Sequence, residues 1–281
     1  MLFRSMLRYA ADVPVLHRIF AAGDPLVADY RGVADPELAR ERGVFVAEGR
    51  MVLRRVLEDS TWAVRSILLN AAAAHDLEPA LGRLAPGVPI YVCKAAEMLG
   101  ITGHDIHRGC LALVERKPAL KPVDVLRAAQ LVVVLEGVGN PDNVGGVFRN
   151  AAAFGADAVL LSPTCCDPLY RKAVRTSMAS TLRVPFATLD DWPAALGTVR
   201  EAGFSLVALT PRTPSVTLEA FVSRPRPARI ALIVGTEGGG LSAAVETLAD
   251  CRVSIPIRPE IDSLNLAVAT GIALHRLGTG A

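Results

Sequence analysis

The sequence predicts an α/β protein in which a small α/β domain precedes a larger domain built on a doubly wound parallel sheet. Three observations lead to this fold class. Short apolar segments alternate with helical segments along the 281 residues. In the second half the apolar segments are continuous runs, which is typical of strands buried on both faces of a parallel sheet. A stretch with two prolines and three positive charges, RKPALKPVD at 116–124, separates the halves.

Composition limits the classes of protein to which this chain can belong. Hydrophobic residues make up 51% of the sequence, enough for a sizeable core, and the net charge is only +2, so any nucleic-acid-binding surface must be a local basic patch. No apolar run approaches the ~20 residues of a membrane span, so we expect no membrane partner. The five cysteines have irregular spacing without a C-x-x-C pair, which favours free thiols in a reducing cytoplasm.

We expect the first domain to span residues 1–115. Its first twenty residues, MLFRSMLRYAADVPVLHRIF, contain Arg4, Arg8 and Arg18 with a single acid, a composition that would suit a mitochondrial transit segment. Serine is scarce, however, and no cleavage region is recognisable. We therefore favour an ordinary, partly frayed N-terminal segment of a bacterial protein.

Four strands and one clearly amphipathic helix are predicted in this domain. The strands are expected at 44–49, 62–70, 89–93 and 110–115. The segment RMVLRRVLED, after the first strand, has helical spacing. Its apolar face comprises Val52, Leu53, Val56 and Leu57. Arg50, Arg54 and Arg55 point toward the other sides.

The segment GHDIHRGC at 103–110 has two histidines and a cysteine at a spacing of three. A zinc site is conceivable, but a fourth ligand is not found nearby in the sequence, and we predict no metal. An RNA-contacting loop, in which His107 and Arg108 meet phosphate or stack on a base, suits the domain better.

A linker is expected at 116–126, followed by the second domain at 127–281. The strands of this domain are predicted at 130–137, 158–162, 204–210, 229–235 and 252–257. The segment SPTCCDPLYRKAVRTS lies after the second of these strands, and we interpret Cys165 and Cys166 as packing thiols. Arg171, Lys172 and Arg175 form a basic helix face, either for contact with an RNA backbone or simply solvated.

Three loops of unusual composition leave the carboxyl ends of predicted strands, at 136–146, 235–242 and 255–265. Ligands of open parallel sheets bind beyond these strand ends, and glycine lets a backbone approach closely. The loops therefore predict one shared pocket. The sequences GVGNPDNVGG and GTEGGG match neither G-x-G-x-x-G nor a Walker loop, and Glu237 would repel phosphate. A nucleotide-binding enzyme of that type is thus disfavoured.

The helix after the first loop is expected to begin near Val144 with Asn143 as its N-cap. The core face consists of Val144, Val147, Phe148 and Ala151. Arg149 lies about 140° from Val144, at ~100° per residue, and should point away from the core.

These loops resemble the three motifs of the SpoU/TrmH branch of the SPOUT methyltransferases. The matching segments are NPDNVGGVFRNAAAFGAD, LIVGTEGGGLS and VSIPIRPEIDSLNLAVATGIAL. The resemblance implies a Rossmann-like sheet with a C-terminal deep trefoil knot, a homodimer formed through the C-terminal domain, and S-adenosylmethionine (SAM) as cofactor. The implied activity is transfer of a methyl group to a ribose 2′-hydroxyl in RNA, with ribosomal RNA favoured over tRNA. The alternatives are a tRNA 2′-O-methyltransferase and a non-catalytic RNA-binding member of the fold.

The first half resembles the ribosomal-protein-like substrate-binding domain of many family members, on the strength of FVAEGRMVLRRVLED and HRGCLALVE. The resemblance also implies site residues. Arg149 matches the catalytic arginine and Asn143 its partner, with a solvated surface charge as the alternative for Arg149. Glu237 matches the carboxylate of the second motif, in either a catalytic or a purely structural role. Ser263 and Asn265 match the polar pair of the third motif, although Ser263 would also suit a helix N-cap.

For SAM, the matching positions are Leu209, Thr210, Gly235, Ile255 and Leu264, which would act mostly through backbone groups. The last helix is expected to start at Leu264, as the threaded segment of the knot. Its apolar stripe of Leu264, Val268 and Ile272 is suited to burial.

Overall fold

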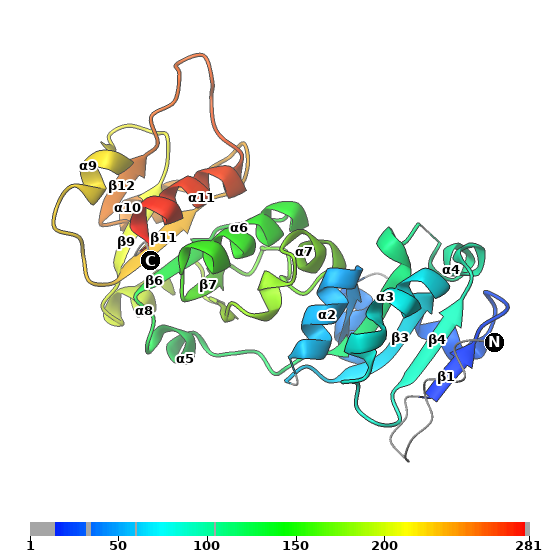
Figure 1. Cartoon of the computed structure of the whole chain (residues 1–281). Helices are drawn as coiled ribbons and strands as arrows, with labels where there is room; N and C mark the ends of the chain where they lie inside the picture. The colour runs from blue at the N-terminus through cyan, green and yellow to red at the C-terminus, as the bar shows by residue number, and fades with distance from the viewer. Residues whose placement is uncertain (1–14, 32–34, 60, 104, 279–281) are drawn as a thin grey trace. The chain divides into compact units, whose positions relative to one another are not determined.

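The computed structural model in Figure 1 describes residues 15–31, 35–59, 61–103 and 105–278. The possible transit segment lies largely outside these residues. The chain divides into two compact units, the first comprising Met1–Lys117 and Leu169–Arg175, the second Pro118–Pro168 and Thr176–Ala281. The division falls within the stretch expected to be a linker. Part of that stretch, Pro122–Leu126, forms the short helix α5, and Leu126 is buried in the core of the second unit.

The described residues of the first unit form a five-stranded sheet with the order β1-β4-β3-β5-β2. The strands are β1 (Val15–Arg18), β2 (Val44–Glu48), β3 (Val64–Asn70), β4 (Pro89–Cys93) and β5 (Cys110–Glu115). All but β1 were predicted. Strand β5 runs antiparallel to β2 and β3, whereas β1, β4 and β3 are parallel.

Short and long helices connect these strands. They are η2 (Pro25–Tyr30), α1 (Asp35–Glu37), η3 (Leu38–Arg42), α2 (Arg50–Glu58), α3 (Ala71–Leu81), α4 (Ala95–Thr102) and η4 (His107–Gly109). In α2 the predicted face of Val52, Leu53, Val56 and Leu57 is buried, which confirms the helical pattern.

The second unit contains a seven-stranded sheet, within its described residues, with the order β10-β12-β9-β11-β6-β7-β8. The strands are β6 (Leu131–Leu135), β7 (Ala158–Leu161), β8 (Phe186–Thr188), β9 (Ser205–Leu209), β10 (Val216–Thr217), β11 (Ile230–Val234) and β12 (Cys251–Ser254). Every pair is parallel, and β6 and β11 are buried along their whole length, as the continuous apolar runs predicted.

The helices of the second half are α6 (Pro141–Phe154), α7 (Arg171–Thr176), η5 (Ser180–Leu182), α8 (Leu196–Glu201), α9 (Leu218–Val222), α10 (Ala243–Leu248) and α11 (Leu266–Leu277). None of the helices in the described residues has the length and apolarity that a membrane span requires. Because β6, β9, β11 and β12 are parallel, the loops that follow them leave the same edge of the sheet. The three loops thus start from one edge, as predicted, and the shared pocket stays a prediction.

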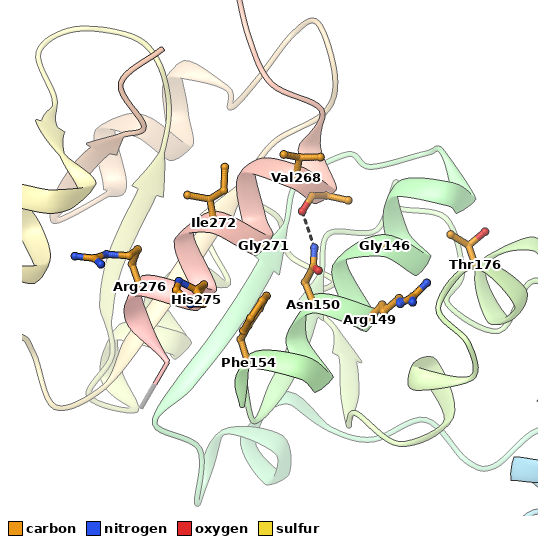
Figure 2. A pocket seen from close by; sticks show the side chains of 11 residues that line it. Gly146, Arg149, Asn150, Phe154, Thr176, Val268, Gly271, Ile272, His275 and Arg276 are labelled. Carbon is orange, nitrogen blue, oxygen red and sulfur yellow. Dashed lines mark hydrogen bonds between the residues drawn. The ribbon is translucent and has the colours of Figure 1, made fainter. Parts of the chain in front are cut away.

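Helices α6 and α11 lie side by side in the second unit, and small residues let them approach closely (Figure 2). A Cβ atom added to Gly146 would lie 2.6 Å from the Cβ of Ala267. One added to Gly271 would lie 2.9 Å from Nδ2 of Asn150, which donates to the carbonyl oxygen of Ala267 at 2.6 Å. The two helices therefore form a fixed pair.

The stripe expected on the last helix is not buried within the single chain. Helix α11 begins at Leu266 rather than Leu264, and Val268 and Ile272 are 51% and 39% exposed. The buried residues of this helix are instead Leu266, Thr270, Ala273, Leu274 and Leu277. The reason is the close contact with α6, which uses the small residues Ala267 and Gly271 and leaves the larger neighbouring side chains outside.

Candidate active site

Helix α6 begins earlier than the sequence suggested, so the expected N-cap role of Asn143 is wrong. The N-cap is Asn140, whose Oδ1 accepts from the backbone N–H of Asp142 at 2.9 Å. Pro141 follows at the first helical position, where its fixed φ and missing N–H are tolerated. Asn143 consequently lies inside the first turn with its side chain buried.

Asn143, Glu237 and Asn265 form a hydrogen-bonded cluster, which we call the amide cluster. The Nδ2 group of Asn265 donates to Oδ1 of Asn143 at 3.0 Å and to Oε1 of Glu237 at 2.7 Å. Oδ1 of Asn265 accepts from the backbone N–H of Val268 at 3.2 Å and so caps α11. One side-chain amide therefore joins residues from all three loops and uses its donors and its acceptor.

Ser263 does not cap the last helix, because Asn265 occupies that position. Ser263 is exposed, as are most residues of the loop 255–265, whereas Ile255 and Leu264 are half-buried. The amide cluster thus contains three of the five residues expected to be catalytic, and Ser263 lies outside it.

Arg149 lies on α6 with an exposed side chain, as predicted, whereas Val144, Val147, Phe148 and Ala151 of the same helix are fully buried. No ion pair involves Arg149 in the described part of the chain. The guanidinium lines a groove of about 530 Å³ along α6 and α11 and points from α6 toward Thr176 (Figure 2). A free cation at the side of this groove is available to an anionic ligand.

The groove also includes Phe154, Val268, Ile272 and His275, and the ring of Phe154 meets that of His275 edge-on at 5.5 Å. None of the five residues expected to bind SAM lines it. Gly146, at the end of the first loop, does line the groove, so the groove adjoins the convergent loops, with Arg149 on the groove side.

The second loop folds tightly back on itself, and we call residues 235–241 the glycine loop. A Cβ atom at Gly235 would lie 2.2 Å from the carbonyl oxygen of Gly240 and 2.5 Å from the nitrogen of Leu241. Gly240 has φ of +67°, and its N–H donates to the carbonyl oxygen of Thr236 at 2.9 Å. This confirms that glycine permits close backbone approach in this loop. The knot itself stays a prediction, with which this contact is compatible.

Glu136 anchors the far end of the glycine loop, and sequence reasoning missed this residue. Its Oε2 accepts from the N–H of Ser242 at 2.8 Å, and its Oε1 accepts from Oγ of Ser242 at 2.7 Å and from Nε1 of Trp192 at 3.0 Å. The sequence offers one signal for this role, since Glu136 is an acidic residue directly after a predicted buried strand. Its carboxylate fixes Ser242, the N-cap of α10.

The remaining positions expected to bind SAM surround the same loops. The side chain of Thr210 is buried and donates to Oε1 of Glu246 at 3.0 Å, so its hydroxyl already has a partner. Leu209 is half-buried at the end of β9. Backbone groups and apolar surface are what these positions offer to a ligand.

The expected basic face on α7 is partly wrong, because two of its charges are paired within the first unit. Nη1 of Arg175 lies 2.9 Å from Oε1 of Glu48, and Nε of Arg171 lies 3.6 Å from Oε2. The side chain of Glu48 is only 1% exposed, and a buried carboxylate requires such partners. Lys172 is the exposed member of the three.

Arg50, Arg54 and Arg108 lie close together on the first unit. The first two share Asp76, at 3.7 Å and 2.9 Å, and Nε of Arg50 donates to the carbonyl oxygen of Arg108 at 3.3 Å. Arg108 adopts φ of +62° in η4. Arg108, expected to contact RNA, thus has two further arginines close to it on the first unit.

The cysteines are free thiols, and burial keeps two of them protonated at neutral pH. Burial raises the pKa of Cys93 to about 11 and that of Cys110 to about 12. Cys165 donates to the carbonyl oxygen of Leu135 at 3.2 Å and packs at the end of β6, as expected. His104 lies outside the described residues, within which no group of three or more His, Cys, Asp or Glu could hold a metal ion.

Comparison with known proteins identifies the family to which the chain is similar. The sequence profile of the SpoU rRNA Methylase family matches residues 130–275. An uncharacterized tRNA/rRNA methyltransferase of Mycobacterium tuberculosis is 37% identical over 268 residues, which cover 92% of each chain.

Solved structures show the same fold. The AdoMet-bound rRNA methyltransferase from Sinorhizobium meliloti superposes with a TM-score of 0.78 and 25% identity, over 93% of this chain and 97% of that one. A SpoU methyltransferase from Streptomyces viridochromogenes, in complex with AdoMet, gives a TM-score of 0.71 at 23% identity, over 89% and 94%. The family match spans the β6–β12 sheet, the amide cluster and the glycine loop. The chain therefore belongs to the SpoU rRNA Methylase family.

Proposed function

We propose that this protein transfers a methyl group from SAM to a ribose 2′-hydroxyl of RNA, with ribosomal RNA as the favoured substrate. The observation that carries the proposal is the amide cluster, in which Asn265 joins Asn143 and Glu237 from three separate loops beside the helix that presents Arg149. Family membership supports RNA methylation. The likeness to an AdoMet-bound rRNA methyltransferase supports SAM.

The residues at the convergent loops suit SAM better than a nucleotide phosphate. Glu237 places a carboxylate in the glycine loop, and the loop lacks the lysine of a phosphate-binding motif. The close turn at Gly235 and the half-buried Leu209, Ile255 and Leu264 provide backbone groups and apolar surface for an adenosine and a methionine chain. When bound, SAM supplies an electrophilic methyl group on its sulfonium.

The residues of the chain act mainly by positioning RNA and stabilising charge. Free arginine stays protonated at physiological pH, so Arg149 is better suited to holding the target phosphate and stabilising the developing 2′-alkoxide than to removing the proton as a base. Asn143, Glu237 and Asn265 keep the loops in register around the reacting groups. Ser263, which is exposed two residues before Asn265, would form a hydrogen bond to RNA.

The groove along α6 and α11 supports a homodimer formed through the C-terminal domain. Val268 and Ile272 expose apolar side chains in this groove, which the ring of Phe154 also lines. Burying such side chains against the same surface of a second copy stabilises the dimer by roughly 25 cal/mol for each Å² of apolar surface removed from water. Arg149 lines this groove, so it would act at the boundary between two copies.

Residues 1–115 would capture RNA, and residues 127–281 would carry the chemistry, in a cytoplasmic enzyme. The arginines around η4 support the first assignment, because clustered guanidinium groups suit phosphate and base stacking. The intact set of Arg149, Asn143, Glu237 and Asn265 argues against a non-catalytic RNA-binding member.

The test is nucleoside mapping of ribosomal RNA and tRNA from cells with and without the gene. We expect one 2′-O-methylated ribosomal nucleotide to disappear with the gene and to return when purified protein and SAM are added to the unmethylated RNA. Loss confined to tRNA would select the tRNA alternative. Unchanged methylation in both RNA classes, with RNA binding retained, would select the non-catalytic alternative.

A further inference from the structure

Arg212, in the segment that follows β9, holds the glycine loop by two of its backbone carbonyl groups. Its Nη2 donates to the carbonyl oxygen of Gly239 at 2.7 Å, and its Nη1 donates to that of Leu241 at 2.9 Å. These two carbonyls flank Gly240, the residue that packs against Gly235. The guanidinium therefore spans the turn at its tightest point.

Arg212 is itself fixed from the opposite side. Its Nη1 lies 3.4 Å from Oε1 of Glu246, a side chain that is only 8% exposed. The hydroxyl of Thr210 donates to the same oxygen at 3.0 Å and accepts from the backbone N–H of Arg212 at 3.2 Å. A buried carboxylate is costly unless it is paired, so Glu246 favours this position of the guanidinium.

The glycine loop requires such a restraint because of its composition. Gly238, Gly239 and Gly240 are consecutive, and Gly238 and Gly240 have φ of +78° and +67°. Glycine loses more conformational freedom on ordering than any other residue. Glu237, which reaches Asn265, lies in this same loop, so the position of the carboxylate depends on how well the loop is ordered.

We propose that Arg212 is a positioning residue for SAM binding, which keeps the glycine loop ordered before SAM arrives. The proposal rests on the proposed function, since it assumes that SAM binds at this loop. A preordered loop spares the ligand the entropic cost of ordering it, so the effect should fall on SAM affinity more than on turnover.

Only the planar fork of an arginine can bridge two carbonyls and a carboxylate at once. A lysine keeps the charge but presents a single ammonium on a flexible chain. Arg212→Lys is therefore the informative substitution, because it preserves the charge balance of Glu246 while losing the bridge.

Arg252 provides a matched control on the same carboxylate. Its Nη1 lies 4.0 Å from Oε2 of Glu246, and its Nε and Nη2 donate to the carbonyl oxygen of that residue at 3.3 Å. These are its hydrogen bonds within the described residues, and they do not involve the glycine loop. Arg252→Lys thus changes the surroundings of Glu246 and leaves the bonds to the loop in place.

The experiment measures SAM affinity by calorimetry and steady-state kinetics with methylatable RNA on the full chain. For Arg212→Lys we expect the Kd and KM for SAM to rise about tenfold, with kcat at saturating SAM within about threefold of wild type. The KM for RNA should not change. Arg252→Lys should match wild type in all four quantities.

Amide hydrogen exchange measures how well the glycine loop is ordered in the absence of SAM. The N–H of Gly240, bonded to Thr236 in the wild type, should exchange about tenfold faster in Arg212→Lys and not in Arg252→Lys. Arg212→Gln, which keeps one donor group, should also exchange faster at Gly240 and bind SAM more weakly. It replaces the lysine variant if that chain melts below the assay temperature.

Wild-type SAM affinity and wild-type exchange at Gly240 in Arg212→Lys would overturn the proposal. Equal losses in both lysine variants would also overturn it, since they would assign the effect to Glu246 rather than to the loop. A wild-type chain that binds no SAM would instead refute the proposed function, and with it the role of Arg212 in SAM binding.

Discussion

The side-chain amide of Asn265 donates to Oε1 of Glu237 at 2.7 Å and thereby ties the start of α11 to the glycine loop. Asn265→Asp should break this tie without removing the helix cap, because aspartate caps as well as asparagine. Two carboxylates would then face each other across the cluster. We expect methyl transfer to fall by about 10²-fold, as when one positioned hydrogen-bond donor is lost from an active site.

The control for this substitution is Asn70→Asp. Asn70 caps α3 in the first unit by accepting from the N–H of Ala73 at 2.8 Å, far from the three loops in sequence. Both variants should keep a melting temperature near that of the wild type. Normal methyl transfer by Asn265→Asp would remove the amide cluster from the catalytic machinery.

Gly235→Ala should damage the glycine loop. The added methyl group would overlap the carbonyl oxygen of Gly240, a backbone atom that cannot move without shifting the turn. We expect destabilisation of about 1–3 kcal/mol, typical of overpacking, and a loss of SAM affinity. Chemical denaturation and calorimetry measure the two effects.

Gly197→Ala is the matched control, because a Cβ there meets nothing within 4 Å and alanine favours the helix α8 in which it lies. It should be neutral or slightly stabilising and should leave SAM affinity unchanged. Equal behaviour of the two alanine variants would show that the turn tolerates a side chain.

Ile272→Glu should convert a dimer into a monomer. Ile272 is 39% exposed in the single chain and lines the groove on α11, so a carboxylate there costs little in the monomer but would be buried in the dimer. Light scattering at micromolar concentration should give the dimer mass for wild type and the monomer mass for the variant.

Val123→Glu serves as its control, since Val123 is 58% exposed on α5, outside the groove. This variant should remain dimeric. A wild-type chain that is monomeric at this concentration would refute the proposed assembly.

Substitution of Arg54 and Arg108 should weaken RNA binding and leave SAM binding intact. Arg108→Asn is chosen because asparagine tolerates the positive φ at this position. Combined with Arg54→Ala, it should lower RNA affinity and reduce the slope of log K against log salt by about 1 for each RNA phosphate that the protein no longer neutralises. Salt-dependent binding titrations measure the slope. An unchanged slope would show that RNA phosphates do not contact Arg54 and Arg108.

Much of the fold could be predicted because burial leaves a local pattern in the sequence. The continuous apolar runs of β6 and β11 and the spaced apolar residues of α2 are such patterns, and each lies where it was expected. Strands β8 and β10 are too short to establish a period, with three and two residues, and they were missed.

The errors arose where a distant or competing residue decides the outcome. Asn143 has the chemistry of an N-cap, but Asn140 with Pro141 starts the helix earlier. The apolar stripe of Val268 and Ile272 gave no sign that Gly271 would pack against α6 in their place. Glu136 meets Ser242 across 106 residues of chain, a separation at which no local pattern exists.

The central claim is that Arg149 serves catalysis rather than folding. Arg149→Ala should change stability by about 0.5 kcal/mol or less, because the side chain is exposed and lies away from the core. SAM affinity should be kept, and methyl transfer should fall by about 10²-fold or more. Arg149→Lys should restore little, since an ammonium lacks the planar fork. Arg200→Ala, which removes an exposed arginine paired with Asp250, should retain full activity.

The most direct measurement is the amount of 2′-O-methylated nucleoside formed by wild type, Arg149→Ala and Arg200→Ala on unmethylated ribosomal RNA, alongside melting temperature and SAM affinity. The predicted result is a folded, SAM-binding Arg149→Ala chain that forms about 1% or less of the wild-type product. If the Arg149 of one chain acts on SAM bound by the other chain, mixing Arg149→Ala with Gly235→Ala chains should recover part of the activity. Near-normal product from Arg149→Ala would contradict the mechanism and return Arg149 to an ordinary surface charge.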